Sequence, residues 1–198
     1  MGVEKRMADR CNTIRLYSFQ TDVVYQVLKR DGVCYSKEEY VRKKYKESAK
    51  VFINAYGWFV KEAQHIVPKP EGAEYPYWAF TDLYNVDQTG DGHVLTLDVP
   101  IGEAILFDMF DWTKIMQMHY IGENESEEAA FSEELKNMGM NEFQIMTSNF
   151  YPEQKARIQE SWNRLFNHQQ AIEAGDNSGV HSVQAGLWCI KGEWIVKE

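Results

Sequence analysis

The chain has 198 residues, of which 44% are hydrophobic and 14% aromatic, enough for one folded domain with a sizeable core. A formal net charge of −9 argues against general binding to a nucleic-acid phosphate backbone, which needs clustered Lys and Arg. Three cysteines without a CxxC pair argue against a disulfide framework and predict a reducing, cytoplasmic location. Since no apolar run reaches the length of a membrane helix, we expect no membrane partner.

The first part of the chain predicts a strand followed by a short helix. Residues 1–12 are polar and are expected to be disordered or frayed. Residues 13–198 are expected to form a single globular domain, because no Pro/Gly/Ser-rich linker divides them. Within this domain Ile14–Thr21 is predicted as a strand, and Asp22–Lys29 as a helix that stops at Asp31-Gly32.

A long amphipathic helix is predicted next. Ser36 and Glu39 have the spacing of a capping box, and apolar residues then recur at helical spacing. The predicted helix runs from about Lys37 to Gln64, and Pro68 and Pro70 end it.

The remaining elements mix strands and helices without regular alternation. This order predicts an α+β domain with a central mixed or antiparallel sheet and flanking helices. The predicted strands are Tyr77–Phe80, Val94–Val99, Ala104–Phe107 and Ser182–Ile190 with a continuation at Glu193–Val196, and the predicted helices are Phe110–Met118 and Tyr151–Phe166.

One loop has the spacing of a calcium site. Oxygen-bearing side chains occupy loop positions 1, 3, 5 and 12, and Gly92 occupies position 6. The final ligand is an Asp with shorter reach than Glu, and the flanking segments are predicted strands rather than helices. An Asp-Gly turn between two strands is therefore the preferred interpretation, with a calcium-stabilised structural domain as an alternative. The four candidate ligands are Asp87, Thr89, Asp91 and Asp98.

Motifs of the common enzyme classes are missing from the sequence. The five histidines have no zinc-helix spacing, and no GxSxG, Walker or GxGxxG motif occurs. Asp108 and Asp111 permit two interpretations. They form either a pair of carboxylates for acid–base chemistry or, as we prefer, the cap of a helix.

Six blocks of the sequence resemble a bacterial family known as domain of unknown function 3841. The resemblance covers nearly the whole chain from Ile14 and implies a small cytoplasmic protein of a bacterium or phage, without naming an activity. The blocks are residues 15–21, 75–80, 95–100, 105–112, 160–166 and 183–188.

A second resemblance is to ADP-ribosyltransferases of the DNA-modifying toxin type. Four segments are similar to the blocks of that family: a strand and helix ending in glycine, an aromatic strand, a strand ending in Asp, and a last strand opening near the catalytic position. They are Leu16–Gly32, Tyr75–Phe80, Ile105–Asp108 and Val183-Gln184. The resemblance implies an ADP-ribosyltransferase-like fold, NAD as substrate, and transfer of ADP-ribose to a protein or nucleic-acid target.

This second resemblance also implies roles for seven residues. Gln184 and Ser18 fall at catalytic positions, with Gln184 near the ribose. Arg15 would contact phosphate, and the rest of the nucleotide site would be Tyr17, Gln20, Tyr77 and Trp78.

The residue at position 184 keeps a second function open. The related enzymes have Glu where this chain has Gln184, and a neutral amide is a poor base. For efficient catalysis another carboxylate, such as Glu193, would have to take its place. The alternative is a non-catalytic module that kept the fold and binds a protein, for which the acidic surface suits a basic partner.

Overall fold

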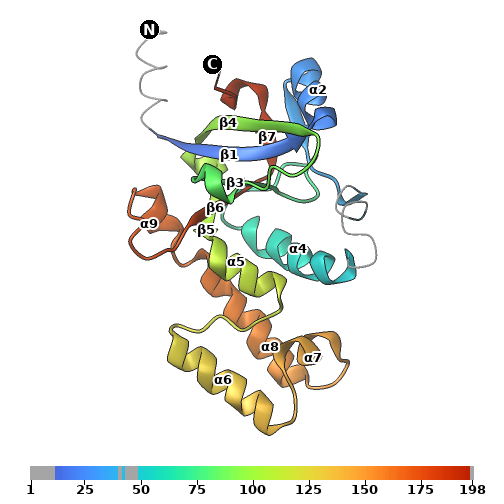
Figure 1. Ribbon diagram of the computed structural model, residues 1–198, viewed down its shortest axis with the longest axis vertical. Coiled ribbons are helices and arrows are strands. Elements are labelled where there is room, and N and C mark those ends of the chain that lie inside the picture. The colour runs from blue at the N-terminus through green and yellow to red at the C-terminus, as the bar shows by residue number, and fades with distance from the viewer. Residues whose placement is uncertain (1–11, 40–41, 43–48, 197–198) are drawn as a thin grey trace.

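The computed structural model describes residues 12–39, 42 and 49–196 (Figure 1). The predicted N-terminal segment, residues 1–12, therefore lies almost wholly outside the described residues. Its last residue directly precedes the first strand, β1 (Thr13–Thr21).

The centre of the fold is a five-stranded sheet in the order β4-β1-β3-β6-β5, and every neighbouring pair is antiparallel. The α+β prediction is confirmed, with an antiparallel rather than a mixed sheet. The inner strand β6 comes late in the chain and lies between β3 and β5, which come much earlier in the chain. Besides β1, the strands are β3 (Tyr77–Phe80), β4 (Gly92–Pro100), β5 (Ile105–Asp108) and β6 (Val183–Leu187).

A second, two-stranded sheet joins the N-terminal and C-terminal parts of the described chain. It pairs β2 (Val33–Tyr35) with β7 (Cys189–Lys191). The predicted C-terminal strand is thus interrupted at Trp188, and the turn Gly192–Trp194 (η5) replaces its continuation.

Helix α2 (Asp22–Asp31) begins as predicted and ends two residues later. Asp22 in the first turn and basic residues in the last turn complement the helix dipole. Gly32 adopts a left-handed conformation with φ of 74° and donates its N–H to the Leu28 carbonyl, so it caps the helix.

Helix α4 (Ala49–Ala63) forms the second half of the predicted long helix. Residues 38, 39 and 42 are also helical, and the remainder of that prediction lies outside the described residues. Phe59 of α4 is fully buried and packs against Trp78 and Phe107 of the sheet. A Cβ atom at Gly186 would lie 2.8 Å from the Phe59 ring, so this glycine allows the helix to approach β6 closely.

Helices α5 to α8 extend from one end of the sheet and form the lower half of the molecule in Figure 1, whereas α9 lies beside β5. Helices α6, α7 and α9 are not predicted from the sequence, and the predicted helix that starts at Tyr151 ends in a 3₁₀ segment, η4. None of the described helices is both long and apolar enough to cross a membrane. These elements are α5 (Met109–Met116), α6 (Glu125–Asn137), α7 (Glu142–Thr147), α8 (Pro152–Ser161), η4 (Trp162–Phe166) and α9 (Gln169–Glu173).

Two apolar clusters cover the two sides of the sheet. One includes Leu16 and Leu97 and lies with α2, β2 and β7. The other includes Phe59, Phe107 and Trp112 and lies with α4, α5 and the lower helices. The core is therefore divided by the sheet, and each strand residue can be assigned to one side.

Candidate functional site

The seven residues that the second resemblance assigns to a nucleotide site lie on two different faces of the sheet. Successive side chains of a strand point to opposite faces. Leu16 belongs to the apolar cluster beside α2, so Ser18 and Gln20 lie on the same face. Arg15 and Tyr17 therefore lie on the other face. We call these two faces the Leu16 face and the Tyr17 face.

A row of side chains crosses the Tyr17 face at the level of Tyr17. The strand register pairs Tyr17 with Thr96 on one side and with Phe80 on the other. Phe80 pairs with Gln184, and Gln184 pairs with Phe107. Because residues paired across antiparallel strands share a face, Tyr17 and Gln184 lie on the same side of the sheet.

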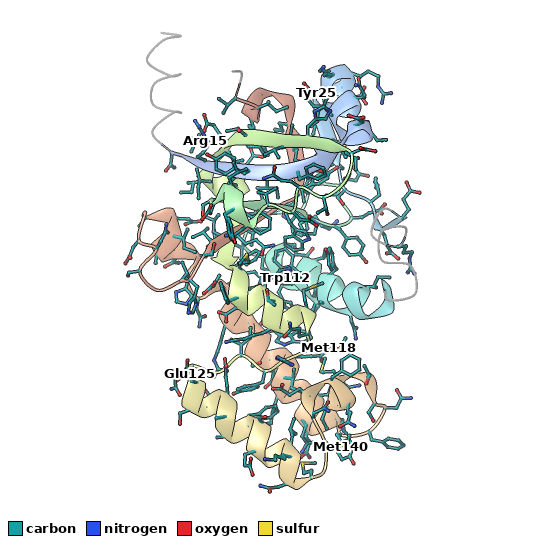
Figure 2. All side chains as sticks on the ribbon, in the orientation of Figure 1. Arg15, Tyr25, Trp112, Met118, Glu125 and Met140 are labelled. Carbon is teal, nitrogen blue, oxygen red and sulfur yellow. The ribbon has the colours of Figure 1, made fainter. Side chains whose placement is uncertain are left out.

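The Tyr17 face is covered over β5, β6 and the Trp78 part of β3, and it is open over β1 and β4. Packing of Phe59 on Phe107 fixes α4 over the covered part. Over the open part, the side chains of Arg15 and Asp98 are 50% and 44% exposed, and Val94 is 37% exposed. Figure 2 shows Arg15 on β1, at the end of the molecule remote from the lower helices.

Arg15 is held by Asp98 on the neighbouring strand. Its Nε donates to Asp98 Oδ1 at 2.5 Å, and its Nη2 donates to Oδ2 at 3.1 Å. This hydrogen-bonded pair raises the pKa of Arg15 further above its usual value, so the guanidinium stays charged. Arg15 is therefore part of an ion pair at the strand surface, and any anionic ligand must compete with Asp98.

Gln184 is buried between two aromatic residues. It is 3% exposed, and its cross-strand neighbours are Phe80 and Phe107. Asp108 lies one register step away, opposite Val183. Glu193, the carboxylate expected to replace a catalytic Glu, lies instead on η5, outside the five-stranded sheet.

Ser18 and Gln20 form a buried polar pair on the Leu16 face. Ser18 Oγ donates to the Trp78 carbonyl at 2.7 Å, and Gln20 Nε2 donates to Ser18 Oγ at 2.8 Å. The two residues are 1% and 9% exposed. Strands β1 and β3 are paired at a single position, Tyr17 with Phe80. The Ser18 hydroxyl therefore donates to the Trp78 carbonyl in place of a backbone N–H of a longer ladder.

Tyr77 and Trp78 point to opposite sides of β3. Tyr77 lies on the Leu16 face, is 8% exposed, and has its hydroxyl 3.1 Å from the Cys34 sulfur. Trp78 lies on the Tyr17 face, and its Nε1 donates to the Tyr56 hydroxyl at 2.7 Å. Its ring centroid is 4.7 Å from that of Trp112. Both residues thus contribute to the packing of the core.

Asp108 caps α5, as preferred from the sequence, and it also holds His181. Its carboxylate accepts hydrogen bonds from the Phe110 and His181 backbone N–H groups, each at 3.0 Å, and lies 2.9 Å from His181 Nδ1. Burial alone raises the pKa of Asp108, but these hydrogen bonds outweigh it and the pKa lies below its usual value. The His181 side chain is 76% exposed, so a buried carboxylate orients an accessible imidazole.

Asp111 behaves differently from Asp108. Burial raises its pKa, and the nearby Lys114 at 3.3 Å only partly offsets that effect. Lys114 is shared with Glu128, whose carboxylate is 2.6 Å away. The two aspartates therefore form separate structural contacts on either side of the first turn of α5.

The predicted calcium loop does not gather its four candidate ligands. Asp87 Oδ1 accepts from the Thr89 backbone and hydroxyl at 3.0 and 2.6 Å, which closes a local turn. Asp98 lies on β4, six positions beyond Gly92 and thus about 20 Å along the extended strand. Among the described residues, no group of three His, Cys, Asp or Glu side chains could hold a metal ion.

His181 is an accessible polar residue beside Asp108 that the sequence does not indicate as a site residue. It is 73 positions away from Asp108, and only the pairing of β5 with β6 brings them together. The strand that ends in Asp108 is predicted from the sequence, but no local pattern indicates its partner.

Comparison with known proteins gives one match. No curated protein and no solved structure matches the chain significantly. The sequence profile of one family, described as Domain of unknown function (DUF3841), matches residues 15–196. Since that match covers nearly the whole described chain, the protein belongs to the DUF3841 family.

Proposed function

We propose that this protein is an ADP-ribosyltransferase-like protein that binds NAD on the Tyr17 face, over the open part formed by β1 and β4. The observation that carries the proposal is the common face of Arg15, Tyr17, Trp78 and Gln184. These residues come from three separate blocks of the sequence, and they lie on three consecutive strands, β1, β3 and β6. The block that ends in Asp108 supplies the next strand, β5.

The open part of this face offers the groups that a dinucleotide needs. Arg15 is charged and half exposed, and phosphate oxygens can replace the Asp98 carboxylate as acceptors of its planar donor group. Tyr17, which is partly exposed, offers a ring for stacking. Ser18, Gln20 and Tyr77 are buried on the Leu16 face, so in this proposal they support the sheet and do not contact the ligand.

The chemistry sets a requirement that Gln184 meets only in part. Cleavage of the bond between nicotinamide and ribose develops positive charge on the ribose carbon. A carboxylate nearby stabilises that charge, whereas the neutral Gln184 amide can only hydrogen-bond a ribose hydroxyl. Because Gln184 is 3% exposed, this contact also requires Phe80 or Phe107 to move aside. Transfer to a protein or nucleic-acid acceptor is therefore expected to be slow.

A second candidate function is a non-catalytic module that binds a protein. The burial of the neutral Gln184 between Phe80 and Phe107 favours it. In addition, Asp108 already accepts several hydrogen bonds, and Glu193 lies on η5. The net charge of −9 suits a basic partner.

Thermal melting with and without NAD tests the proposal. A ligand that binds only the folded state raises the melting temperature, and we expect NAD to do so for the wild type and less for Arg15→Ala. Arg30→Ala is the matched control, because Arg30 makes a similar two-pronged pair with Asp31, at 2.7 Å for both bonds. Melting that does not respond to NAD in a folded wild type would overturn the proposal.

Release of nicotinamide from NAD separates the two candidate functions. Release that Gln184→Ala abolishes supports transfer, because Gln184 is the group proposed to hold the ribose. If NAD binds and nicotinamide is not released, the binding module becomes the better description.

A further inference from the structure

A cavity of about 320 Å³ lies between β7 and the loop that follows α4. Three aromatic side chains, Tyr35, Trp188 and Trp194, line it, and Lys191 and Glu103 supply charged groups. None of these residues belongs to the NAD site proposed above. The volume lies at the lower end of the range typical of small-molecule sites.

The aromatic wall of this cavity is fixed before any ligand arrives. Trp188 is 3% exposed, and its Nε1 donates to the Val67 carbonyl at 2.7 Å, which sets the orientation of the indole. Trp194 is 4% exposed. Tyr35 packs against both apolar clusters, and a Cβ atom at Gly72 would lie 3.0 Å from its ring. The two buried indoles form a fixed apolar backing, and Tyr35 is the partly exposed ring of the three. A ring already held in place favours a flat ligand, because packing on it costs little conformational freedom.

The polar groups of the cavity form one adjacent donor and acceptor. Lys191 Nζ lies 2.7 and 2.6 Å from the two carboxylate oxygens of Glu103. The ammonium also lies 4.9 Å from the centre of the Trp194 ring, so its position is fixed from two sides. The two side chains are 30% and 40% exposed, and each keeps hydrogen-bonding capacity beyond the pair.

The remaining wall is chemically inert. Burial raises the pKa of Cys189 to about 11, so its thiol stays protonated at neutral pH and is a weak nucleophile. The charges of Lys191 and Glu103 cancel, which favours a neutral ligand over an anion.

We propose that this cavity binds a planar, neutral heteroaromatic group that carries a hydrogen-bond acceptor beside an N–H donor. Lys191 donates to the acceptor, Glu103 accepts from the N–H, and the ligand ring packs against Tyr35. The carboxamide of nicotinamide and the oxygen-bearing edge of guanine both have this chemistry.

Calorimetric titration of the full chain tests the proposal with three probes. Nicotinamide and guanosine carry the required edge, and their two titrations distinguish a free carboxamide from a nucleobase. Nicotinate has the same ring as nicotinamide but an anionic carboxylate, which Glu103 repels. We expect saturable binding of nicotinamide, guanosine or both, and no binding of nicotinate.

Three variants assign the binding to the cavity. Lys191→Met should weaken binding about tenfold or more, because it removes a charged donor. Glu103→Gln should admit nicotinate, because the repulsion is removed and a donor is added. Lys61→Met is the matched control, because Lys61 is 75% exposed and pairs with Glu62 outside this cavity.

Circular dichroism of each variant shows whether it is folded. If neither nicotinamide nor guanosine binds the folded wild type at millimolar concentration, the proposal is wrong. It is also wrong if a folded Lys191→Met chain binds them as well as the wild type does. Glu103→Gln adds an independent check, because it predicts a gain of nicotinate binding that unfolding cannot imitate.

Discussion

Strand β1 places polar residues on both faces of the sheet, and the two sets differ in burial and in their hydrogen-bond partners. On the Leu16 face, Ser18 and Gln20 are buried and hydrogen-bonded to each other and to β3. On the Tyr17 face, Arg15 is half exposed and pairs with Asp98 of the neighbouring strand β4. Polar residues of one strand therefore serve the packing on one face and remain accessible on the other, so a polar residue type alone does not indicate a ligand site.

The largest expected effect comes from a matched pair of valines on β4. Val99 is fully buried beside Leu16, whereas Val94 is 37% exposed on the Tyr17 face. Val99→Ala should lower the free energy of unfolding by about 2 to 3 kcal/mol, from lost burial and the cavity left behind. Val94→Ala should cost less than about 0.5 kcal/mol. Urea denaturation of both variants measures the difference, and equal losses would mean that the two faces are packed alike.

Ser18→Ala tests whether the buried polar pair supports the sheet. The change removes the donor to the Trp78 carbonyl and the acceptor for Gln20. Leaving such groups unpaired should cost about 1 to 2 kcal/mol of unfolding free energy. NAD-dependent melting shifts should persist in this variant. Loss of the NAD-dependent melting shift without loss of stability would mean that Ser18 contacts the ligand.

Asp108→Asn extends the comparison to a polar group at the end of β5. The pKa of Asp108 is lowered in the folded state, so its contribution is complete above the unfolded pKa of about 3.9 and is lost as the pH falls through the lower folded pKa. We expect the variant to be about 1 kcal/mol less stable at pH 7. The difference from the wild type should shrink below pH 4, which urea denaturation at several pH values measures. A difference independent of pH would show that the carboxylate charge is not what stabilises this turn.

Arg15→Ala should have the smallest effect on stability. An exposed ion pair contributes little to stability, and salt weakens it further. We therefore expect no measurable change in the urea midpoint at moderate salt, as for the reference variant Arg30→Ala. A measurable loss would mean that Arg15 serves the fold in the same way as Ser18.

Part of this arrangement can be predicted from the sequence. The alternation along β1 already separates Arg15 and Tyr17 from Leu16 and Ser18, since strand residues of opposite parity face opposite ways. The predicted bounds of β1, β3, β4 and β5 agree with the structure within one or two residues, because each strand is a short apolar or alternating run.

Other parts depend on contacts that no local pattern contains. Asn141 and Gln144 form a capping box, so a signal for α7 is present in the sequence. Helix α9 has no side-chain cap at its start and is held by Gln169, whose Oε1 accepts from the Leu106 N–H. The partner of Asp108, the position of Glu193 and the cavity beside Trp188 all follow from strand pairings between distant segments.

The order of the strands has a consequence for synthesis of the protein. The ribosome releases β1, β3, β4 and β5 long before β6, yet β6 is the strand that joins β3 to β5. Until residue 187 emerges, the edges of β3 and β5 have no native partner, and exposed strand edges invite pairing with other chains. Completion of the sheet must therefore follow translation of the last strands, and a nascent chain held at residue 180 would present two open edges to chaperones.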